Sequence, residues 1–246
     1  MKRCLTFLLT VVMLFSLTAC DTSPDVPDDG STTTASSATT TTTAAQPMVR
    51  ITYSTSENAT LQELQKSCDI LEQRLMAMGM SGYRISITEN EAILLEIPRS
   101  YYPGNMNKLA YIWGSQGEFA ICVGDKDDGI VPMPPEDTVL DYRHVASAQA
   151  VMLQSGKYAV TLTFTAEGAS LLADITTELA KTQDYLYFHM DWEFMDTVQV
   201  LQPITDGECV LTGFASEEAA ALFAAKLNAG ILPYNYAADV DFSLVE

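Results

Sequence analysis

The chain has 246 residues, 48% of them apolar, which is enough for one large domain or two small ones with a packed core. Its formal net charge is −19, and such an acidic surface is repelled by the phosphates of nucleic acids and by anionic lipid headgroups. The composition therefore argues against nucleic acid as a partner. A basic protein partner and a surface that merely solubilises the protein both stay open.

The first residues are typical of an export signal. Lys2 and Arg3 precede an apolar run over 5–17, and small residues follow. The run is too short for a comfortable membrane span, but it has the length of the apolar region of a secretory signal peptide. We therefore predict a signal peptide over 1–19, and we find no later segment in the sequence that is long and apolar enough to span a membrane.

Residues 17–20, Leu-Thr-Ala-Cys, resemble the lipobox of bacterial lipoproteins. The resemblance implies cleavage between Ala19 and Cys20 and attachment of lipid, palmitate included, at Cys20; the alternative is a plain signal peptide with an incidental cysteine. Two acyl chains anchor a protein stably where one does not. Residues 20–47 are rich in Thr and Ser and could not build a core, so we predict a disordered tether. The protein would then lie on the extracytoplasmic face of the cell membrane, anchored by lipid alone.

Residues 48–123 have the element order of a ferredoxin-like base, βαββαβ. Thr60 and Glu63 have the spacing of a capping box, and apolar residues at three- and four-residue steps after them predict an amphipathic helix. The other elements predicted in this unit are strands over 49–54, 83–88, 92–98 and 118–123 and a helix over 105–113.

The pattern breaks over 124–138, where Gly, Pro and charged residues predict a linker between two subdomains. Residues 139–246 then predict a smaller α+β head. It contains one helix with Thr165 as N-cap and a second with Ser216 as N-cap, separated by strands. The final strand is predicted over 239–245, and it can pair with the strands of the base. The predicted fold class is α+β, with a ferredoxin-like base followed by this head.

No pattern in the sequence predicts a catalytic, cofactor or metal site. Asp191 and Glu193 point to one face of a predicted strand, and a carboxylate pair can hydrolyse glycosides, so a hydrolase is an alternative that requires a cleft there. The acidic run over 125–129 is similar to a calcium loop but lacks its Gly and ligand positions. The two histidines, His144 and His189, have no second ligand at metal spacing.

Three cysteines lie beyond the signal peptide and Cys20: Cys68, Cys122 and Cys209. They are far apart, and each lies among apolar neighbours, where a free cysteine usually behaves as a small hydrophobic residue. We predict three buried thiols, with one disulfide as the alternative in an exported protein.

A series of short motifs runs in order through the folded part of the chain. It includes Arg74 with Gly79 at a helix end, a strand and helix over 160–176, and the stretch GFASEEAAALFAAKLNAGILP over 213–233. Together these motifs, spread over 60–234, resemble the first extracytoplasmic domain of the SecD family of secretion accessory proteins. The head residues that carry the resemblance are Asp191, Gly213, Glu218, Ala219, Gly230, Leu232 and Pro233.

The resemblance implies a hinged head that contacts unfolded polypeptide emerging from the export channel, or subunits of the translocon. We therefore expect a non-enzymatic binding module without a cofactor that assists protein export. The family continues into six transmembrane helices that couple movement to protons, and this sequence ends at Glu246, so we expect no motor of its own. The alternative is a repurposed surface lipoprotein that binds another protein or a wall component and has no secretion role. Departures from the family at Val198, which replaces a Pro, and at Arg99, which replaces a Gly, favour that alternative.

Overall fold

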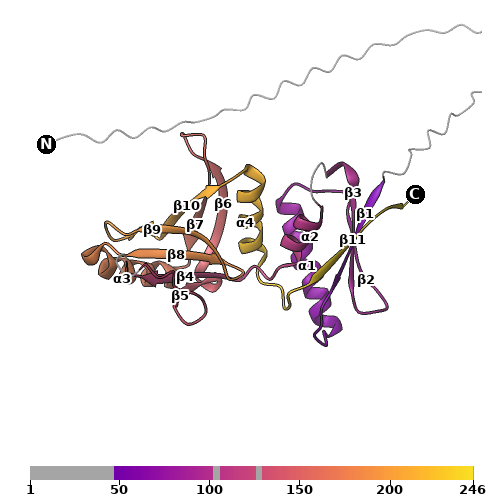
Figure 1. Ribbon diagram of the computed structural model, residues 1–246, viewed down its shortest axis with the longest axis horizontal. Helices are drawn as coiled ribbons and strands as arrows, with labels where there is room; N and C mark the ends of the chain where they lie inside the picture. Colours follow the sequence, from indigo (N-terminus) through magenta and orange to yellow (C-terminus); the bar gives the residue numbers. More distant parts are fainter. Residues whose placement is uncertain (1–46, 102–105, 126–128, 246) are drawn as a thin grey trace, which may run out of the picture. The chain divides into compact units, whose positions relative to one another are not determined.

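The computed structural model describes residues 47–101, 106–125 and 129–245, which form an α+β fold with four α-helices and three antiparallel sheets (Figure 1). The predicted fold class is confirmed. The predicted signal peptide, Ala19, Cys20 and nearly all of the predicted tether lie outside the described residues. Within the described ranges, no helix combines the length and the hydropathy that a membrane span requires.

The elements whose ranges were predicted in the base, over 49–54, 83–88, 92–98, 105–113 and 118–123, agree with the structure to within one residue at each end. The strands are β1 (Met48–Ser54), β2 (Arg84–Ile87), β3 (Ile93–Pro98), β4 (Phe119–Gly124), β5 (Thr138–Asp141), β6 (Val145–Met152), β7 (Tyr158–Phe164), β8 (Tyr185–Met190), β9 (Glu193–Gln199), β10 (Glu208–Phe214) and β11 (Ala237–Val245). The helices are α1 (Leu61–Ala77), α2 (Met106–Gly114), α3 (Ala166–Thr182) and α4 (Glu217–Ala229), with short 3₁₀ helices η1 (Arg99–Tyr101) and η2 (Tyr142–His144).

The base is a four-stranded sheet in the order β11-β1-β3-β2, with α1 and α2 packed on one side of it (Figure 1). The capping box at the start of α1 is confirmed: the Glu63 N–H donates to Thr60 Oγ1 over 3.3 Å, and the Thr60 N–H donates to the Glu63 carboxylate over 2.9 Å. Leu64, Leu71 and Leu75 then bury one stripe of the helix against the sheet.

The fourth strand of the base differs from the prediction. We expected 118–123 to complete the base over 48–123, but β4 pairs with β5 and β8 in the head, and β11 pairs with β1 instead. The region predicted as a linker between subdomains, 124–138, consequently connects two strands of the head. The reason is that periodicity identifies a strand but not its partner. A strand such as β4, buried on both faces, can fit either core.

The head contains two sheets, β10-β7-β6 and β5-β4-β8-β9. Their inner faces share one apolar core with α3, and the largest side chains of this core include Phe119, Phe188 and Phe223. The N-cap of α3 is the predicted one, since Thr165 Oγ1 accepts the Gly168 N–H over 3.0 Å. Gly168 also lies directly against the backbone of His144, which leaves no space there for a side chain.

Helix α4 contributes to both hydrophobic cores. Leu222 belongs to the core of the base, and the neighbouring Phe223 belongs to the core of the head. Ser216 is its N-cap, as predicted, and Gly230 ends it with a φ of 85°. A helix whose apolar residues cover more than one stripe is buried on more than one side. In Figure 1 α4 lies between α1 and the strand β6, in agreement with its packing against both elements.

Candidate functional site

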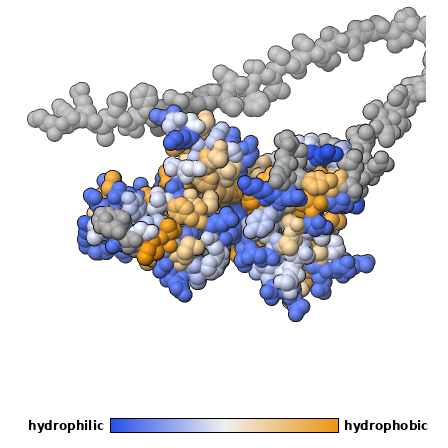
Figure 2. Space-filling view, in the orientation of Figure 1, coloured by the Kyte–Doolittle hydropathy of each residue, from blue (hydrophilic) through white to orange (hydrophobic). Residues whose placement is uncertain are grey.

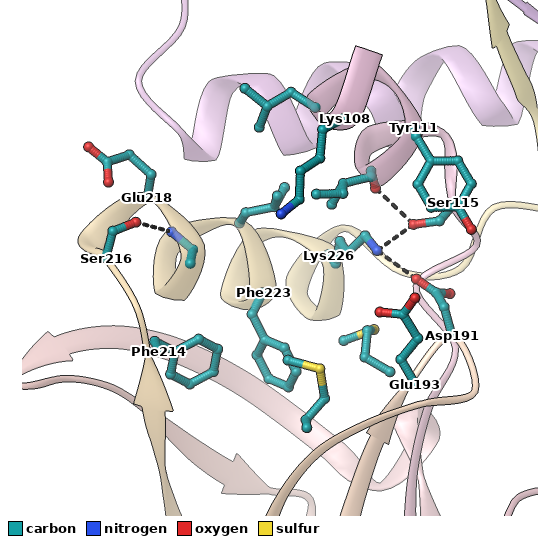
Figure 3. Close-up of a pocket in the computed structure, with 16 residues that line it drawn as sticks. Lys108, Tyr111, Ser115, Asp191, Glu193, Phe214, Ser216, Glu218, Phe223 and Lys226 are labelled. Atoms are coloured by element: carbon teal, nitrogen blue, oxygen red, sulfur yellow. Dashed lines mark hydrogen bonds and ion pairs between the residues drawn. The ribbon is translucent and has the colours of Figure 1, made fainter. Parts of the chain in front are cut away.

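A cavity of about 410 Å³ lies where α2, the turn between β8 and β9, and the start of α4 meet (Figure 3). Its lining is mostly apolar. The apolar side chains come from α2, from β8 and β9, and from β10 and α4: Leu109, Ile112, Met190, Met195, Phe214, Ala219, Leu222 and Phe223. The volume lies at the lower end of the range for ligand pockets, and an apolar lining with a few polar groups is what such pockets share.

Charged side chains surround this apolar lining. Glu193 from β9 and Glu218 from the first turn of α4 face the cavity, and the described residues offer neither of them a cation within ion-pair distance. Tyr111 on α2 is 62% exposed and lies on the same side of the cavity as Glu193, with Glu218 on the other side. Lys108 lines the same cavity. The cavity therefore has an apolar floor and a rim that carries two carboxylates: Glu193, which interacts electrostatically with Lys226, and Glu218, which has hydrogen bonds with its own backbone and with Ser216.

A buried ion pair closes one end of the cavity. Lys226 Nζ on α4 donates to Asp191 Oδ2 over 2.6 Å and also to the hydroxyl of Ser115 (Figure 3). The other Asp191 oxygen, Oδ1, accepts the backbone N–H groups of Gly117 and Glu118 over 2.6 and 3.0 Å. This carboxylate thus fastens the tip of the β8–β9 hairpin to α4 and to the segment between α2 and β4.

The surroundings of this ion pair decide how its members ionise. Burial favours the neutral form of Asp191, but the charge and hydrogen bond of Lys226 and the Glu118 N–H outweigh it and lower the pKa of Asp191 below its ordinary value. Burial lowers the pKa of Lys226 as well, and the attraction of Asp191 opposes that shift. A glycosidase needs a carboxylic acid with a raised pKa. The structure therefore gives Asp191 a structural role and does not support it as the acid of a hydrolase.

A second buried cation lies next to the ion pair. Arg74 on α1 has no exposed surface, and its guanidinium donates to the carbonyls of Trp113, Ser115, Gln116 and Gly230 over 2.6 to 3.2 Å. Burial lowers the pKa of Arg74 to about 10, so it stays charged near neutral pH. The guanidinium fork thereby fixes the chain segment that follows α2 against the end of α4.

The structure brings three of the predicted head residues together at the cavity and leaves the others outside it. Asp191, Glu218 and Ala219 line it. Gly213, with a φ of 88°, lies at an irregularity in β10 just before Phe214. The remaining three serve the connection to the base: the Gly230 carbonyl accepts from Arg74, Leu232 is buried in the base core, and Pro233 follows it.

Sequence reasoning did not identify Lys226 or Ser115 as members of a site, and it noted Arg74 only as part of a helix end. A usable signal was present. Lys226 lies four residues after Leu222 and three after Phe223, on the apolar stripe of its helix, and Arg74 lies among Leu71 and Leu75 in the same way. A cation at such a position must be buried, and a buried cation requires partners.

The other candidate groups form no site. Cys68, Cys122 and Cys209 are free and buried, as predicted, and burial raises the pKa of Cys68 to about 11 and that of Cys209 to about 12. His189 is buried in the head, where desolvation lowers its pKa. Across the described ranges no three His, Cys, Asp or Glu side chains are placed to hold a metal ion. Part of the acidic run over 125–129 lies outside those ranges.

The fold and the cavity define a class of protein. It is an α+β domain with a ferredoxin-like base, a head inserted before the last base strand, and an apolar cavity beside the helix α4 that base and head share. Residues 124–234 match the family model described as "SecDF, P1 head subdomain". The match covers the head from the end of β4 through α4 and leaves the base strands β1, β2, β3 and β11 outside it.

Curated relatives agree with this family. The protein translocase subunit SecDF of Thermus thermophilus is 28% identical, over 72% of this chain and 27% of its own length. The protein translocase subunit SecD of Acidaminococcus fermentans is 25% identical, over 69% of this chain and 37% of its own length. The chain therefore spans between a quarter and two fifths of the length of these relatives.

Solved structures show the same fold. A crystal structure of SecDF in a super-membrane-facing form aligns with a TM-score of 0.60 at 24% identity, over 79% of this chain and 30% of the other. A structure from work on a membrane component SecDF that enhances protein export aligns with a TM-score of 0.57 at 24% identity, over 77% of this chain and 97% of the other. The second match extends over nearly the whole of that shorter chain, so base and head occur together in it.

Proposed function

We propose that this protein is a non-enzymatic polypeptide-binding module that assists protein export from the extracytoplasmic face of the cell membrane. The observation that carries the proposal is the apolar cavity with a carboxylate rim, located in a region homologous to the SecDF P1 domain. An unfolded exported chain presents apolar side chains that a folded protein would bury. A cavity lined by Leu222, Phe223 and Met195 can cover one such side chain without altering it chemically.

Anchoring at Cys20 is part of the same proposal. Lipid at that position and a tether over 20–47 would confine the domain near the membrane without fixing its orientation. A Cys20→Ala variant is expected to lose incorporation of labelled palmitate and to leave the membrane fraction. If Cys20→Ala keeps both the label and the membrane association, lipid attachment at Cys20 is wrong, and the polypeptide-binding proposal has to be judged separately.

Site-specific photo-crosslinking in living cells tests the binding proposal. A benzoylphenylalanine is introduced at Tyr111, on the rim of the cavity, or at Met195, on its wall. The matched control is the same residue at Leu61, which is 71% exposed but lies at the start of α1, outside the cavity. Newly made secreted chains or translocon subunits should be labelled from the two cavity positions several times more strongly than from the control.

The alternative, a repurposed lipoprotein without a secretion role, gives a different pattern in the same experiment. Crosslinks from Tyr111 and Met195 would then contain one folded surface protein or a wall component and no newly exported chain. A deletion strain would also process pulse-labelled secreted proteins at the normal rate, whereas the export proposal expects slower processing. Equal labelling from Leu61 and from the cavity positions would contradict both versions of a specific site.

A further inference from the structure

The two head sheets each end in an edge strand, and these two edges lie close to each other. β9 is the last strand of the sheet β5-β4-β8-β9, and β10 is the last strand of the sheet β10-β7-β6. They form no ladder with each other in the described structure. A side chain links them instead: Asp196 Oδ2 accepts the backbone N–H of Thr212 over 3.0 Å. One donor of the β10 edge is thereby satisfied, whereas a paired strand would satisfy a whole row.

The edges separate toward the cavity. The Asp196–Thr212 link lies in the middle of the two strands, and beyond it the first residues of β9, Glu193 and Met195, line the cavity together with Phe214 at the end of β10. The side chains at the start of β9 therefore border the apolar cavity, next to the unpaired edge of that strand. An extended segment could enter there and place every second side chain between Met195 and α4.

The beginning of β9 has features of an edge that accepts another strand. Trp192 and Phe194 are each 49% exposed, and Met195 is 37% exposed. Phe194 faces away from the cavity, toward the rings of Tyr187 and His189. The pairing of β9 with β8 skips Met195, which is the extra residue of a β-bulge. An exposed apolar edge is a template for pairing, and proteins usually protect such edges with charge, proline or a bulge. The bulge at Met195 and the charge of Asp196 protect the later part of β9, so the pairing concerns the residues before Asp196. Figure 2 shows that apolar side chains on the visible face form separate patches among hydrophilic ones.

We infer that the start of β9, residues 193–195, binds an extended segment of exported polypeptide by strand addition, with alternate apolar side chains entering the cavity and flanking Lys or Arg residues held by Glu193 on one side of the cavity and by Glu218 on the other. This inference rests on the proposed function and specifies how the chain is recognised. Backbone pairing provides affinity that does not depend on sequence, while the cavity selects apolar side chains. The two rim carboxylates and the formal charge of −19 favour segments with basic residues.

Backbone-methylated peptides test the pairing. The probe is a fluorescent ten-residue peptide that alternates valine with threonine and carries a lysine at each end; its binding to the full chain is measured by anisotropy. Methylating the valine amides blocks one edge of the extended peptide, and methylating the threonine amides blocks the other. Strand addition uses one edge only, so one methylated peptide should bind roughly tenfold or more weakly, which corresponds to about 1.4 kcal/mol. The other should bind like the unmethylated peptide.

The outcomes separate this inference from the proposed function. If the unmethylated peptide binds and the two methylated peptides bind equally well, strand addition is wrong while polypeptide binding stands. If none of the three peptides binds, both the strand-addition inference and the proposed function fail.

A proline at the bulge provides a second readout, since proline is tolerated at bulges but cannot donate a hydrogen bond. Met195→Pro should weaken binding of the unmethylated peptide by roughly tenfold, and the control Met195→Leu by less than about threefold. Circular dichroism verifies that both variants fold.

The proposed preference for segments with basic residues has its own matched control. The double variant Glu193→Gln and Glu218→Gln should bind the lysine peptide roughly five- to tenfold more weakly at low salt. Its affinity for a peptide with serine in place of lysine should be unchanged. The control variant, Glu57→Gln with Glu89→Gln, removes the same charge from exposed positions in the base and should change neither affinity. If both double variants weaken the lysine peptide equally, the rim carboxylates have no specific role, and only the general charge of the protein matters.

Discussion

In the base, one sheet holds the hydrophobic core, and the last strand of the chain returns to complete it beside β1. In the head, the strands divide into two sheets, and the edges β9 and β10 are joined by a side chain rather than by a ladder. The base thus completes its sheet with the chain's own last strand. Both regions keep open edges, since β11 and β2 end the base sheet, but in the head the edge strand β9 lies next to the apolar cavity, which is the arrangement expected of a part that binds another chain.

The segment that connects these two regions is held by charged groups that have nearly all their partners. Arg74 fixes the chain after α2, and Lys226 with Asp191 fixes the head hairpin to α4. Buried charges cost stability unless they are paired and hydrogen-bonded. The concentration of such paired charges indicates that the connection between base and head has one fixed geometry. The neighbouring strand edges and the cavity rim are not fixed in this way and can bind a partner.

The largest effect is expected where the connection depends on one side chain. Arg74→Met removes the donor to four carbonyls and should lower the free energy of unfolding by about 4 kcal/mol, since each buried group left without a partner costs about 1–3 kcal/mol. The loss in free energy of unfolding is measured by urea denaturation. Arg84→Met, in which an arginine that is 65% exposed loses its bond to Glu96, should cost less than about 1 kcal/mol. Equal losses in the two variants would contradict a special role for Arg74.

The ion pair of the connection should give the next largest loss. Lys226→Met leaves the Asp191 carboxylate buried without its cation and should cost about 3 kcal/mol. The double variant with Asp191→Asn should recover part of that loss, because neither member then leaves a charge behind. Lys181→Met, which breaks an exposed pair with Glu178, is the control and should cost less than about 0.5 kcal/mol. Strictly additive effects of the two substitutions would show that the pair is not coupled.

Within the head, a close approach between two elements gives a third test. A Cβ on Gly168 would collide with the backbone of His144, so Gly168→Ala should destabilise by about 2 kcal/mol, although alanine normally favours a helix over glycine by about 1 kcal/mol. Thermal unfolding measures the change. Ser170→Ala, at an exposed position of the same helix, should change stability by less than about 0.5 kcal/mol. A stabilised Gly168→Ala variant would mean that α3 can move away from η2 at little cost.

Local patterns were sufficient to predict the elements but not their assembly. Thr60, Thr165 and Ser216 are N-caps as expected, because a cap depends on neighbours only a few residues away. The partner of β4 depends on contacts with β8, more than sixty residues later, and no periodicity encodes that choice. The cavity was missed for the same reason. Its walls come from three separated stretches of chain, and the only lining residues named individually from the sequence were Asp191, Glu193, Ser216, Glu218 and Ala219.

The smallest expected effect concerns the pH dependence of the connection. The pKa of Asp191 is lowered in the folded state, so this group stabilises the fold at pH values above its ordinary pKa of about 3.9, and the contribution is lost as the pH falls toward the folded value. Between about pH 5 and pH 3 the unfolded chain takes up a proton at this position before the folded chain does. The wild-type protein should therefore lose more stability over that interval than Asp191→Asn does.

The test compares how steeply the free energy of unfolding falls with pH in the wild type and in Asp191→Asn. The comparison cancels the contribution of other carboxylates with lowered pKa values, such as Glu96 and Asp141, because both proteins retain them. Identical slopes for the wild type and Asp191→Asn would mean that Lys226 does not hold this carboxylate in its ionised form. The contrast between a fixed connection and an available edge would then depend on Arg74 alone.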